Sequence, residues 1–287
     1  MEFIYVYLLV LAVAIILGRI REFKWAGKVQ PYVTGVLIFF MGMWAGNEIR
    51  SLSAVGQLFM TSSEILVPSV GVGYLTASVF GDRPAEISGA RAKRSKLPYS
   101  FAISAALGWM VGAFVLLPSP TEVISGLLTL LVLVIGLDMG PSVGLDSFKR
   151  DLTHSWIPFS ALVGAVAGGL ISSALFSLNV KFSVAASVGL GWYSLDGPLL
   201  SSYFGPNYGM VGFMVNFLRE QMTFFAVPLL RDQKPGALLT IGGSTTMDDT
   251  LSLYASTLGD EYKEIALFNG LVLSMIIPFL LPFILSA

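Results

Sequence analysis

The sequence predicts an all-α polytopic membrane protein with about eight transmembrane helices and two re-entrant or broken-helix hairpins, arranged as inverted repeats. Three observations indicate this fold class. The chain of 287 residues is 55% hydrophobic and only 12% charged, whereas a soluble domain carries about 25% charged residues. Its apolar stretches reach the roughly 20 residues that a spanning helix needs. Two further apolar stretches are interrupted by glycines and polar residues.

Six spanning helices are predicted in a first part, residues 1–180. Their expected ranges are 3–18, 29–46, 52–80, 97–117, 123–137 and 156–178. The first range follows Glu2 instead of a basic segment, and no small-residue cleavage site comes after it. We therefore interpret it as a transmembrane helix and not as a signal peptide.

The distribution of Lys and Arg predicts the orientation of these helices. The loops after the first, third and fifth helices hold most of the basic residues: Arg19, Arg21, Lys24, Lys28, Arg83, Arg91, Lys93, Arg94, Lys96, Lys149 and Arg150. The loops after the even helices hold only Arg50 and Lys181. Because cytoplasmic loops are enriched in Lys and Arg, we expect the odd loops inside and the N-terminus outside the cytoplasmic (plasma) membrane.

The second part, residues 181–287, is predicted to carry the substrate site. It contains two interrupted segments and two ordinary helices, and their expected ranges are 182–204, 237–258, 209–230 and 268–286. The first interruption is expected over residues 191–198, which include Asp196-Gly197-Pro198, and the second over residues 242–249. Since Arg231 and Lys234 are expected to be cytoplasmic, the first hairpin enters from outside, the second from inside, and the C-terminus lies outside. Ten full crossings are the alternative.

Two weak internal similarities indicate repeats. Residues 37–45 resemble 131–139, so the first part has a possible three-plus-three inverted repeat. The stretch 194–203, SLDGPLLSSY, likewise resembles 244–254, STTMDDTLSLY. Inverted repeats with interrupted segments near the bilayer midplane are typical of secondary transporters. Chance similarity between apolar segments is the competing interpretation.

Composition argues against an enzyme. The chain has no cysteine and one histidine, His154, and it lacks the HExxH, P-loop and GxSxG motifs. Thiolate metal sites and a Ser-His-Asp triad are therefore not expected, and neither is a metal or another cofactor. A purely structural membrane protein is also disfavoured, because nothing would offset the cost of its intramembrane acids.

The candidate binding residues are ionisable or polar groups at membrane depth. Ionisable groups there cost at least about 2.5–3.5 kcal/mol and usually mark a functional site. Glu64 lies before Pro68 and fits a site or a helix kink equally well. The full set of candidates for substrate or proton binding is Glu64, Tyr193, Ser194, Asp196, Asn216, Glu220, Ser244, Thr245, Thr246, Asp248 and Asp249.

These carboxylates predict a cationic ligand. Non-helical backbone in a membrane must be buried in protein or line a cavity, although the two interruptions could also be polar loops outside the membrane. A lone carboxylate in such a cavity favours its protonated form, and an entering cation would displace that proton. The sequence therefore predicts exchange of protons for an organic cation.

Several short motifs resemble the LysO-type lysine exporter family of prokaryotes. They are Gly191-Trp192-Tyr193-Ser194-Leu195 with Gly197, Leu199 and Leu200, Phe204-Gly205-Pro206, Arg219-Glu220, Gly243-Ser244-Thr245-Thr246-Met247-Asp248 and Phe39-Phe40-Met41-Gly42. The resemblance extends over most of the chain and is strongest from Gly189 onwards. Two residues depart from the pattern: Asp196 stands where serine is expected, and Asp249 where an apolar residue is expected.

The resemblance implies export of L-lysine, and of analogues such as thialysine, in exchange for protons. It also implies that the membrane-embedded acids are Glu220 and Asp248. A sodium/proton or other cation antiporter that uses the same acids is the alternative. The expected partners are L-lysine, protons and membrane lipid, with a homo-oligomer left open and no nucleic acid.

Overall fold

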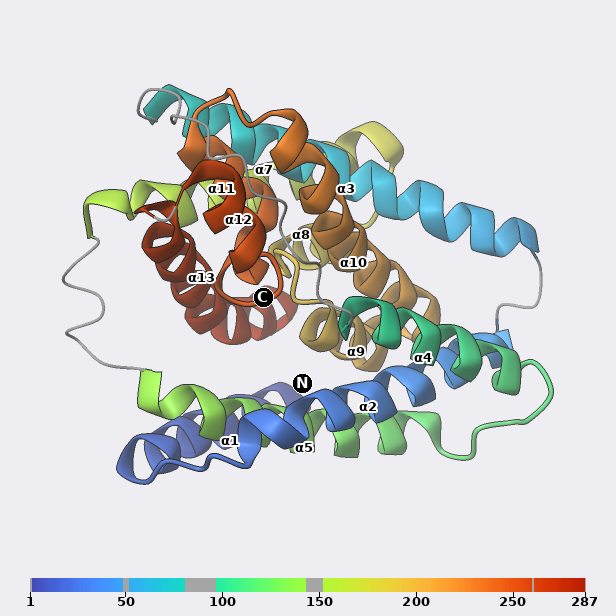
Figure 1. Cartoon of the computed structure of the whole chain (residues 1–287). Helices are drawn as coiled ribbons and strands as arrows, with labels where there is room; N and C mark the ends of the chain where they lie inside the picture. The colour runs from blue at the N-terminus through green and yellow to red at the C-terminus, as the bar shows by residue number, and fades with distance from the viewer. Residues whose placement is uncertain (1, 49–51, 81–96, 143–151, 260, 287) are drawn as a thin grey trace.

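A computed structural model describes residues 2–48, 52–80, 97–142, 152–259 and 261–286, and the regular structure in these ranges is helical (Figure 1). The predicted loop cations at 81–96 and 143–151, and Arg50, lie outside the described residues. The longer helices are α1 (Glu2–Ile20), α2 (Ala26–Glu48), α3 (Leu52–Phe80), α4 (Leu97–Gly112), α5 (Pro120–Met139), α7 (Trp156–Phe176), α10 (Pro206–Leu229) and α13 (Glu261–Ser286). The shorter ones are α8 (Val180–Val188), α9 (Tyr193–Phe204), α11 (Pro235–Gly242), α12 (Leu251–Leu258) and the single turns η1 (Gly140–Ser142), η2 (Leu152–His154) and η3 (Gly243–Met247).

Four of these helices, α2, α3, α7 and α13, are long and apolar enough to cross a membrane. The chain is therefore an all-helical, multi-pass membrane protein. The count of eight crossings and the inverted repeats stay predictions.

The predicted helix bounds differ from the observed ones where polar residues continue a helix. The expected range 52–80 matches α3. Helix α13 begins at Glu261, well before the expected residue 268. Its first turns are helical but carry charged residues, so the apolar pattern did not include them. Helix α4 ends at Gly112 and does not continue to residue 117. Hydropathy finds the apolar centre of a helix and leaves out its polar ends.

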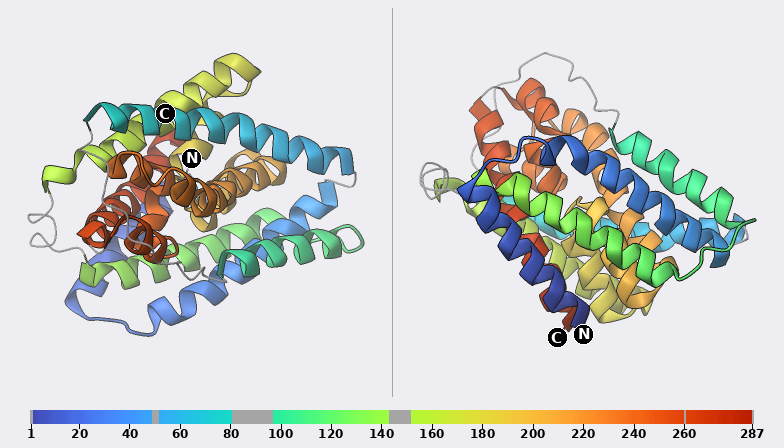
Figure 2. Two further views of the ribbon diagram at one scale, coloured as in Figure 1. Left: turned by 45° about the horizontal axis from the view of Figure 1, so that its top comes forward. Right: turned by 90° about the horizontal axis from the view of Figure 1, so that it is seen from below.

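The longer helices run between two ends of the molecule. At one end, here the Lys181 end, Lys181 Nζ donates to the carbonyl of Leu285, 3.5 Å away. The start of α1 and the end of α13 also lie side by side in both views of Figure 2. At the other end, the Lys234 end, Lys234 Nζ donates to the carbonyl of Ser78 over 2.6 Å. Helix α3 therefore ends at the Lys234 end, and helix α13 ends at the Lys181 end.

Helices α1, α2, α4 and α5 form one layer, here the four-helix group, and α3 with α7 to α13 form the hairpin group (Figures 1 and 2). Within each group, glycines bring backbones into contact, as small residues do between membrane helices. Gly42 of α2 faces the backbone of Ala105 on α4, and Gly164 of α7 faces that of Gly73 on α3. Helices α3 and α7 pack with the later helices, and the predicted parts 1–180 and 181–287 stay a prediction.

The two interrupted segments fold as hairpins. The Phe182 ring, at the start of α8, lies 5.8 Å from that of Phe204 at the end of α9, so the first hairpin (residues 180–204) begins and ends at the Lys181 end. In the second hairpin (residues 235–258), Tyr254 Oη of α12 donates to the carbonyl of Leu238 on α11 over 2.9 Å. That hairpin begins next to Lys234, so the two enter from opposite ends.

The first interruption is shorter and begins earlier than the predicted residues 191–198. The non-helical residues are 189–192, whereas the predicted residues 193–198, with Asp196, Gly197 and Pro198, are inside α9. Pro198 lies in the second turn of α9, where its missing N–H leaves the carbonyl of Ser194 without the usual helical bond. The second interruption matches the predicted residues 242–249.

Candidate functional site

The tips of the two hairpins touch in the middle of the hairpin group. The Ser244 backbone N–H and its Oγ both donate to the carbonyl of Leu190, at 2.8 and 3.1 Å. Leu190, Gly191 and Gly243 have positive φ angles of 49°, 101° and 61°. A Cβ atom at Gly243 would overlap the carbonyl of Leu190. Glycine at 243 therefore permits the close crossing of the tips.

A partly open cavity lies between these tips and helices α2 and α4. Its walls combine hydroxyl, aromatic and acidic side chains. The lining residues are Gln30, Pro31, Thr34, Phe101, Gly191, Trp192, Tyr193, Ser194, Ser244, Thr245, Met247, Asp248, Asp249 and Ser274.

The charges in this lining are negative. Asp248 is exposed to the cavity and Asp249 is partly exposed, while the described residues of the lining include no Lys, Arg or His. The N-terminus of the 12-residue helix α9, at Tyr193 and Ser194, supplies partial positive charge on the same cavity. The cavity therefore offers a place for a cation beside a place for an anion, as a zwitterion with an extra positive charge requires.

Glu220 lies behind the cavity wall, on the middle of α10. Its side chain is fully buried, and neither carboxyl oxygen has a hydrogen-bond partner among the described residues. Tyr193 lies beside it, and Asp248 and Asp249 are close enough to interact with it electrostatically. A buried carboxyl group without a partner is costly and needs an explanation. Protonation of Glu220 would remove the buried charge.

Asp196 and Asn216 form a buried pair on the far side of the first tip. Asn216 Nδ2 donates to Asp196 Oδ2 over 2.7 Å, and Asn216 Oδ1 accepts from the Gly191 N–H, also over 2.7 Å. The same Nδ2 reaches the carbonyls of Ala186 and Gly212. Asn216 thus fixes the non-helical residues between α8 and α9 to α10. Neither side chain lines the cavity.

Arg219 supports the second tip. Its Nε donates to the carbonyl of Ile241 over 2.9 Å and its Nη2 to that of Thr240 over 2.7 Å. Its Nη1 also lies 3.3 Å from Ser69 Oγ on α3. The guanidinium is 2% exposed and caps the negative end of α11. Arg219 and Glu220 therefore act on different parts of the site, as expected for neighbours on a helix.

The structure brings together many but not all of the predicted site residues. Tyr193, Ser194, Ser244, Thr245, Asp248 and Asp249 line the cavity. Thr246 points away from it, donating to the carbonyl of Gly243 and accepting from Asn269 on α13. Glu64 is not in the lining, and its backbone carbonyl accepts from Ser172 of α7.

The predicted set omitted the residues that other helices contribute to the cavity. Gln30 and Thr34 come from α2, Phe101 from α4 and Ser274 from α13. Single hydroxyls and aromatics are common in membrane helices, so the sequence gives no sign of them. The tip residue Trp192 was visible in the first motif but was not counted as a ligand.

Comparison with known proteins gives consistent relatives. Residues 102–285 match the family described as lysine exporter LysO. The Escherichia coli protein "Lysine exporter LysO" is 28% identical over 180 residues, which are 62% of this chain and 60% of that protein. The "Putative lysine exporter" of Haemophilus influenzae is 27% identical over 183 residues, 63% of this chain and 92% of that protein.

The match therefore spans less than two thirds of the length of the Escherichia coli relative. No solved structure matches the chain. The family match covers well over half of the residues and includes α10, both hairpins and every acid of the site. This chain belongs to the lysine exporter LysO family.

Proposed function

We propose that this protein is a secondary transporter that exports L-lysine, and analogues such as thialysine, across the cytoplasmic membrane in exchange for protons. The observation that carries the proposal is the cavity at the hairpin tips. Its charges are the carboxylates of Asp248 and Asp249, and it also receives the N-terminus of α9. Family membership and the printed names of both relatives support lysine as the cation.

Lysine fits the cavity by charge and by shape. One ammonium group pairs with Asp248 or Asp249, which the cavity exposes. The α-carboxylate binds at the N-terminus of α9, with the Ser194 hydroxyl as a further donor. The rings of Trp192, Tyr193 and Phe101 line the remaining wall, where an alkyl chain packs and an ammonium gains a cation–π contact.

Glu220 and Asp248 bind the substrate ammonium group and the coupling proton in turn. Entry of a cation beside Asp248 favours release of a proton from the buried Glu220, since the two groups interact electrostatically. Lysine leaves an inside-negative cell against about 2.3 kcal/mol per 100 mV. Exchange of one Lys⁺ for one H⁺ cancels that electrical cost. The concentration gradients of lysine and protons then set the direction.

The Lys234 end faces the cytoplasm in this proposal. Described basic residues gather there: Arg19, Arg21, Lys24, Lys28, Arg231, Lys234 and Lys263. Lys181 lies at the opposite end, together with the start of α1 and the end of α13. The positive-inside rule then places both of these helix ends outside.

Purified protein in proteoliposomes tests the proposal. Vesicles are loaded with radiolabelled lysine and a pH-sensitive dye, and an outside-acid gradient is applied. We expect lysine efflux together with internal acidification, and competition by thialysine. Glu220→Gln and Asp248→Asn should slow the exchange at least tenfold. Exchange by both variants at the parent rate would contradict the role of these acids.

The same assay separates the rival function. A sodium/proton antiporter with these acids would acidify or alkalinise the vesicles in response to a sodium gradient without lysine. A sodium-driven pH change without lysine efflux would contradict the lysine proposal and support a sodium/proton antiporter. The aromatic lining favours an organic cation, because Na⁺ is coordinated by oxygen atoms and the faces of the three rings supply none.

A further inference from the structure

The contact between the four-helix group and the hairpin group differs from the contacts inside each group. The described glycines that bring backbones together do so between helices of one group. In the four-helix group, Gly18 and Gly140 join α1 to α5, and Gly108 joins α4 to α2. In the hairpin group, Gly168 joins α7 to α3, and Gly209 joins α10 to α9.

The inter-helix hydrogen bonds of the described residues follow the same division. Asn47 Nδ2 of α2 donates to the carbonyl of Gly112 on α4 over 2.6 Å, inside the four-helix group. Ser187 Oγ of α8 donates to the carbonyl of Ala165 on α7 over 2.6 Å, inside the hairpin group. These contacts join the helices within each group to one another.

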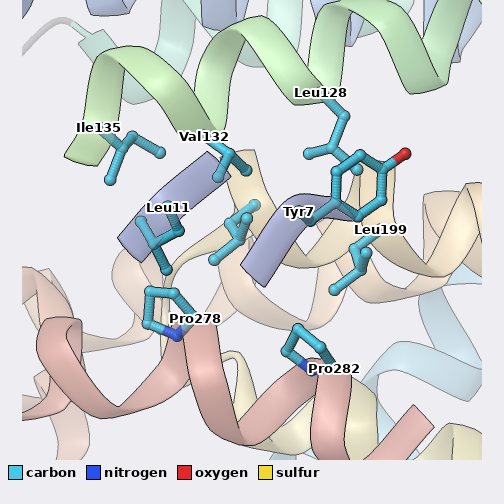
Figure 3. Close-up of a pocket in the computed structure, with 9 residues that line it drawn as sticks. Tyr7, Leu11, Leu128, Val132, Ile135, Leu199, Pro278 and Pro282 are labelled. Carbon is cyan, nitrogen blue, oxygen red and sulfur yellow. The ribbon is translucent and has the colours of Figure 1, made fainter. Parts of the chain in front are cut away.

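The surface between the groups is apolar. Figure 3 shows Leu128, Val132 and Ile135 of α5 on one side of this surface and Pro278 and Pro282 of α13 on the other, with Tyr7 and Leu11 of α1 between them in this view. These side chains, with Leu195 and Leu199, border a narrow apolar gap. Apolar side chains can slide along such a surface without loss of hydrogen bonds, whereas the interlocked backbones within each group cannot.

The acidic cavity lies on the same surface. The hairpin group supplies the acids and the tips, and the four-helix group supplies Gln30, Thr34 and Phe101. The ring of Phe101 lies 6.0 Å from that of Tyr193, across the division between the groups. We call Gln30, Thr34 and Phe101 the α2–α4 wall. The substrate site is complete only when this wall faces the tips.

We propose that the α2–α4 wall is a substrate-contacting barrier, and that the hairpin group moves along it as one body to expose lysine to each side of the membrane in turn. This inference rests on the proposed transport function. The hairpin tips travel together because Ser244 is bonded to Leu190. Rigid-body movement of one bundle against another is a known route to alternating access.

Cross-linking tests the movement, and the absence of cysteine from the chain makes introduced thiols unique. Leu128→Cys with Leu199→Cys places one thiol on each group, on opposite walls of the apolar gap. A flexible, reducible bifunctional thiol reagent should lower lysine exchange at least tenfold, and reduction should restore it. The matched control, Ser78→Cys with Lys234→Cys, lies within the hairpin group and should keep its exchange rate after cross-linking.

Spin labels give a second measurement that does not depend on buried positions. Ile16 of α1 and Leu175 of α7 are 58% and 68% exposed and belong to different groups. We expect the distance distribution between labels at Ile16→Cys and Leu175→Cys to shift when lysine or pH is changed. Labels at Ile16→Cys and Ile103→Cys, both in the four-helix group, should keep their distance.

The outcomes separate this inference from the proposed function. A cross-linked Leu128→Cys/Leu199→Cys protein that exchanges lysine at its uncross-linked rate overturns the movement, and so does an inter-group distance that is fixed under all conditions. Failure of the parent protein to move lysine overturns the proposed substrate instead. In that case a pH-dependent shift between the groups would still support the moving hairpin group.

Discussion

The Ser244 amide donates to the carbonyl of Leu190 over 2.8 Å and so joins two hairpins that enter the protein from opposite ends. The residues on either side of this bond present the acids, hydroxyls and helix N-terminus of the cavity. The geometry of this crossing therefore determines the geometry of the site. It also makes the crossing the most sensitive place to test the structure.

Gly243→Ala should disrupt the crossing. The added Cβ would overlap the carbonyl of Leu190, and the φ angle of 61° is unfavourable for alanine. We expect a loss of about 1–3 kcal/mol in stability, seen as a lower Tm in detergent, and a loss of lysine exchange. Gly71→Ala on α3 has open space around its Cβ and should leave both unchanged. An unaltered Tm for Gly243→Ala would argue against this crossing.

Substitutions of Asn216 and Asp196 should affect lysine exchange differently, although the two side chains are hydrogen-bonded to each other. Asn216→Leu removes the acceptor of the Gly191 N–H and the donor to two carbonyls, so the first tip loses its support. We expect at least tenfold slower lysine exchange. Asp196→Asn keeps an oxygen for Asn216 and lies outside the cavity lining, so its half-saturating lysine concentration should stay within about twofold of the parent. A large rise in the half-saturating lysine concentration of the Asp196→Asn variant would instead indicate that Asp196 contacts the substrate.

Arg219 should not be replaceable by lysine. Its Nε and Nη2 bind two adjacent carbonyls, and a lysine ammonium cannot reproduce that fork. Each buried carbonyl left without a donor costs about 1–3 kcal/mol. We expect Arg219→Lys to lower the Tm and the yield of folded protein. The exposed Arg231→Lys, whose contact with Asp232 is 4.0 Å long, should have no measurable effect.

Thr34 tests the α2–α4 wall directly. Thr34→Val keeps the shape of the side chain and removes one hydroxyl from the cavity. Loss of a neutral hydrogen bond of about 0.5–1.5 kcal/mol should raise the half-saturating lysine concentration by about two- to tenfold. Val36→Ala, on the exposed face of α2, is the control. If Thr34→Val and Val36→Ala give equal kinetics, Thr34 does not contact lysine.

The sequence predicted the helices well because bilayer-length apolar runs are a strong signal. The range 52–80 agrees with α3, and the break at 242–249 agrees with the observed one. The break near Asp196 was placed too late, since Gly197 and Pro198 resemble helix breakers. Both are accommodated inside α9, where Gly197 lets the helix approach Phe213 of α10.

The site was predictable in part, for a related physical reason. Acids in apolar segments stand out by their cost, so Glu220, Asp248 and Asp249 could be predicted as site residues. Which face each residue presents depends on packing between helices far apart in the chain. That information decides that Asp196 binds Asn216 behind the cavity and that Gln30 and Thr34 line it. Apolar periodicity carries no signal for such contacts.

The bond between the tips also has a consequence for biosynthesis. Leu190 obtains its donor from Ser244, which is made 54 residues later. Until the ribosome has supplied the second hairpin, the carbonyl at the first tip has no such donor, and unsatisfied backbone within a bilayer is costly. The first hairpin is therefore expected to wait at the membrane surface or in the insertion machinery. Its stable entry then depends on the arrival of residues 235–258, so the two hairpins, within residues 180–258, are assembled as a unit.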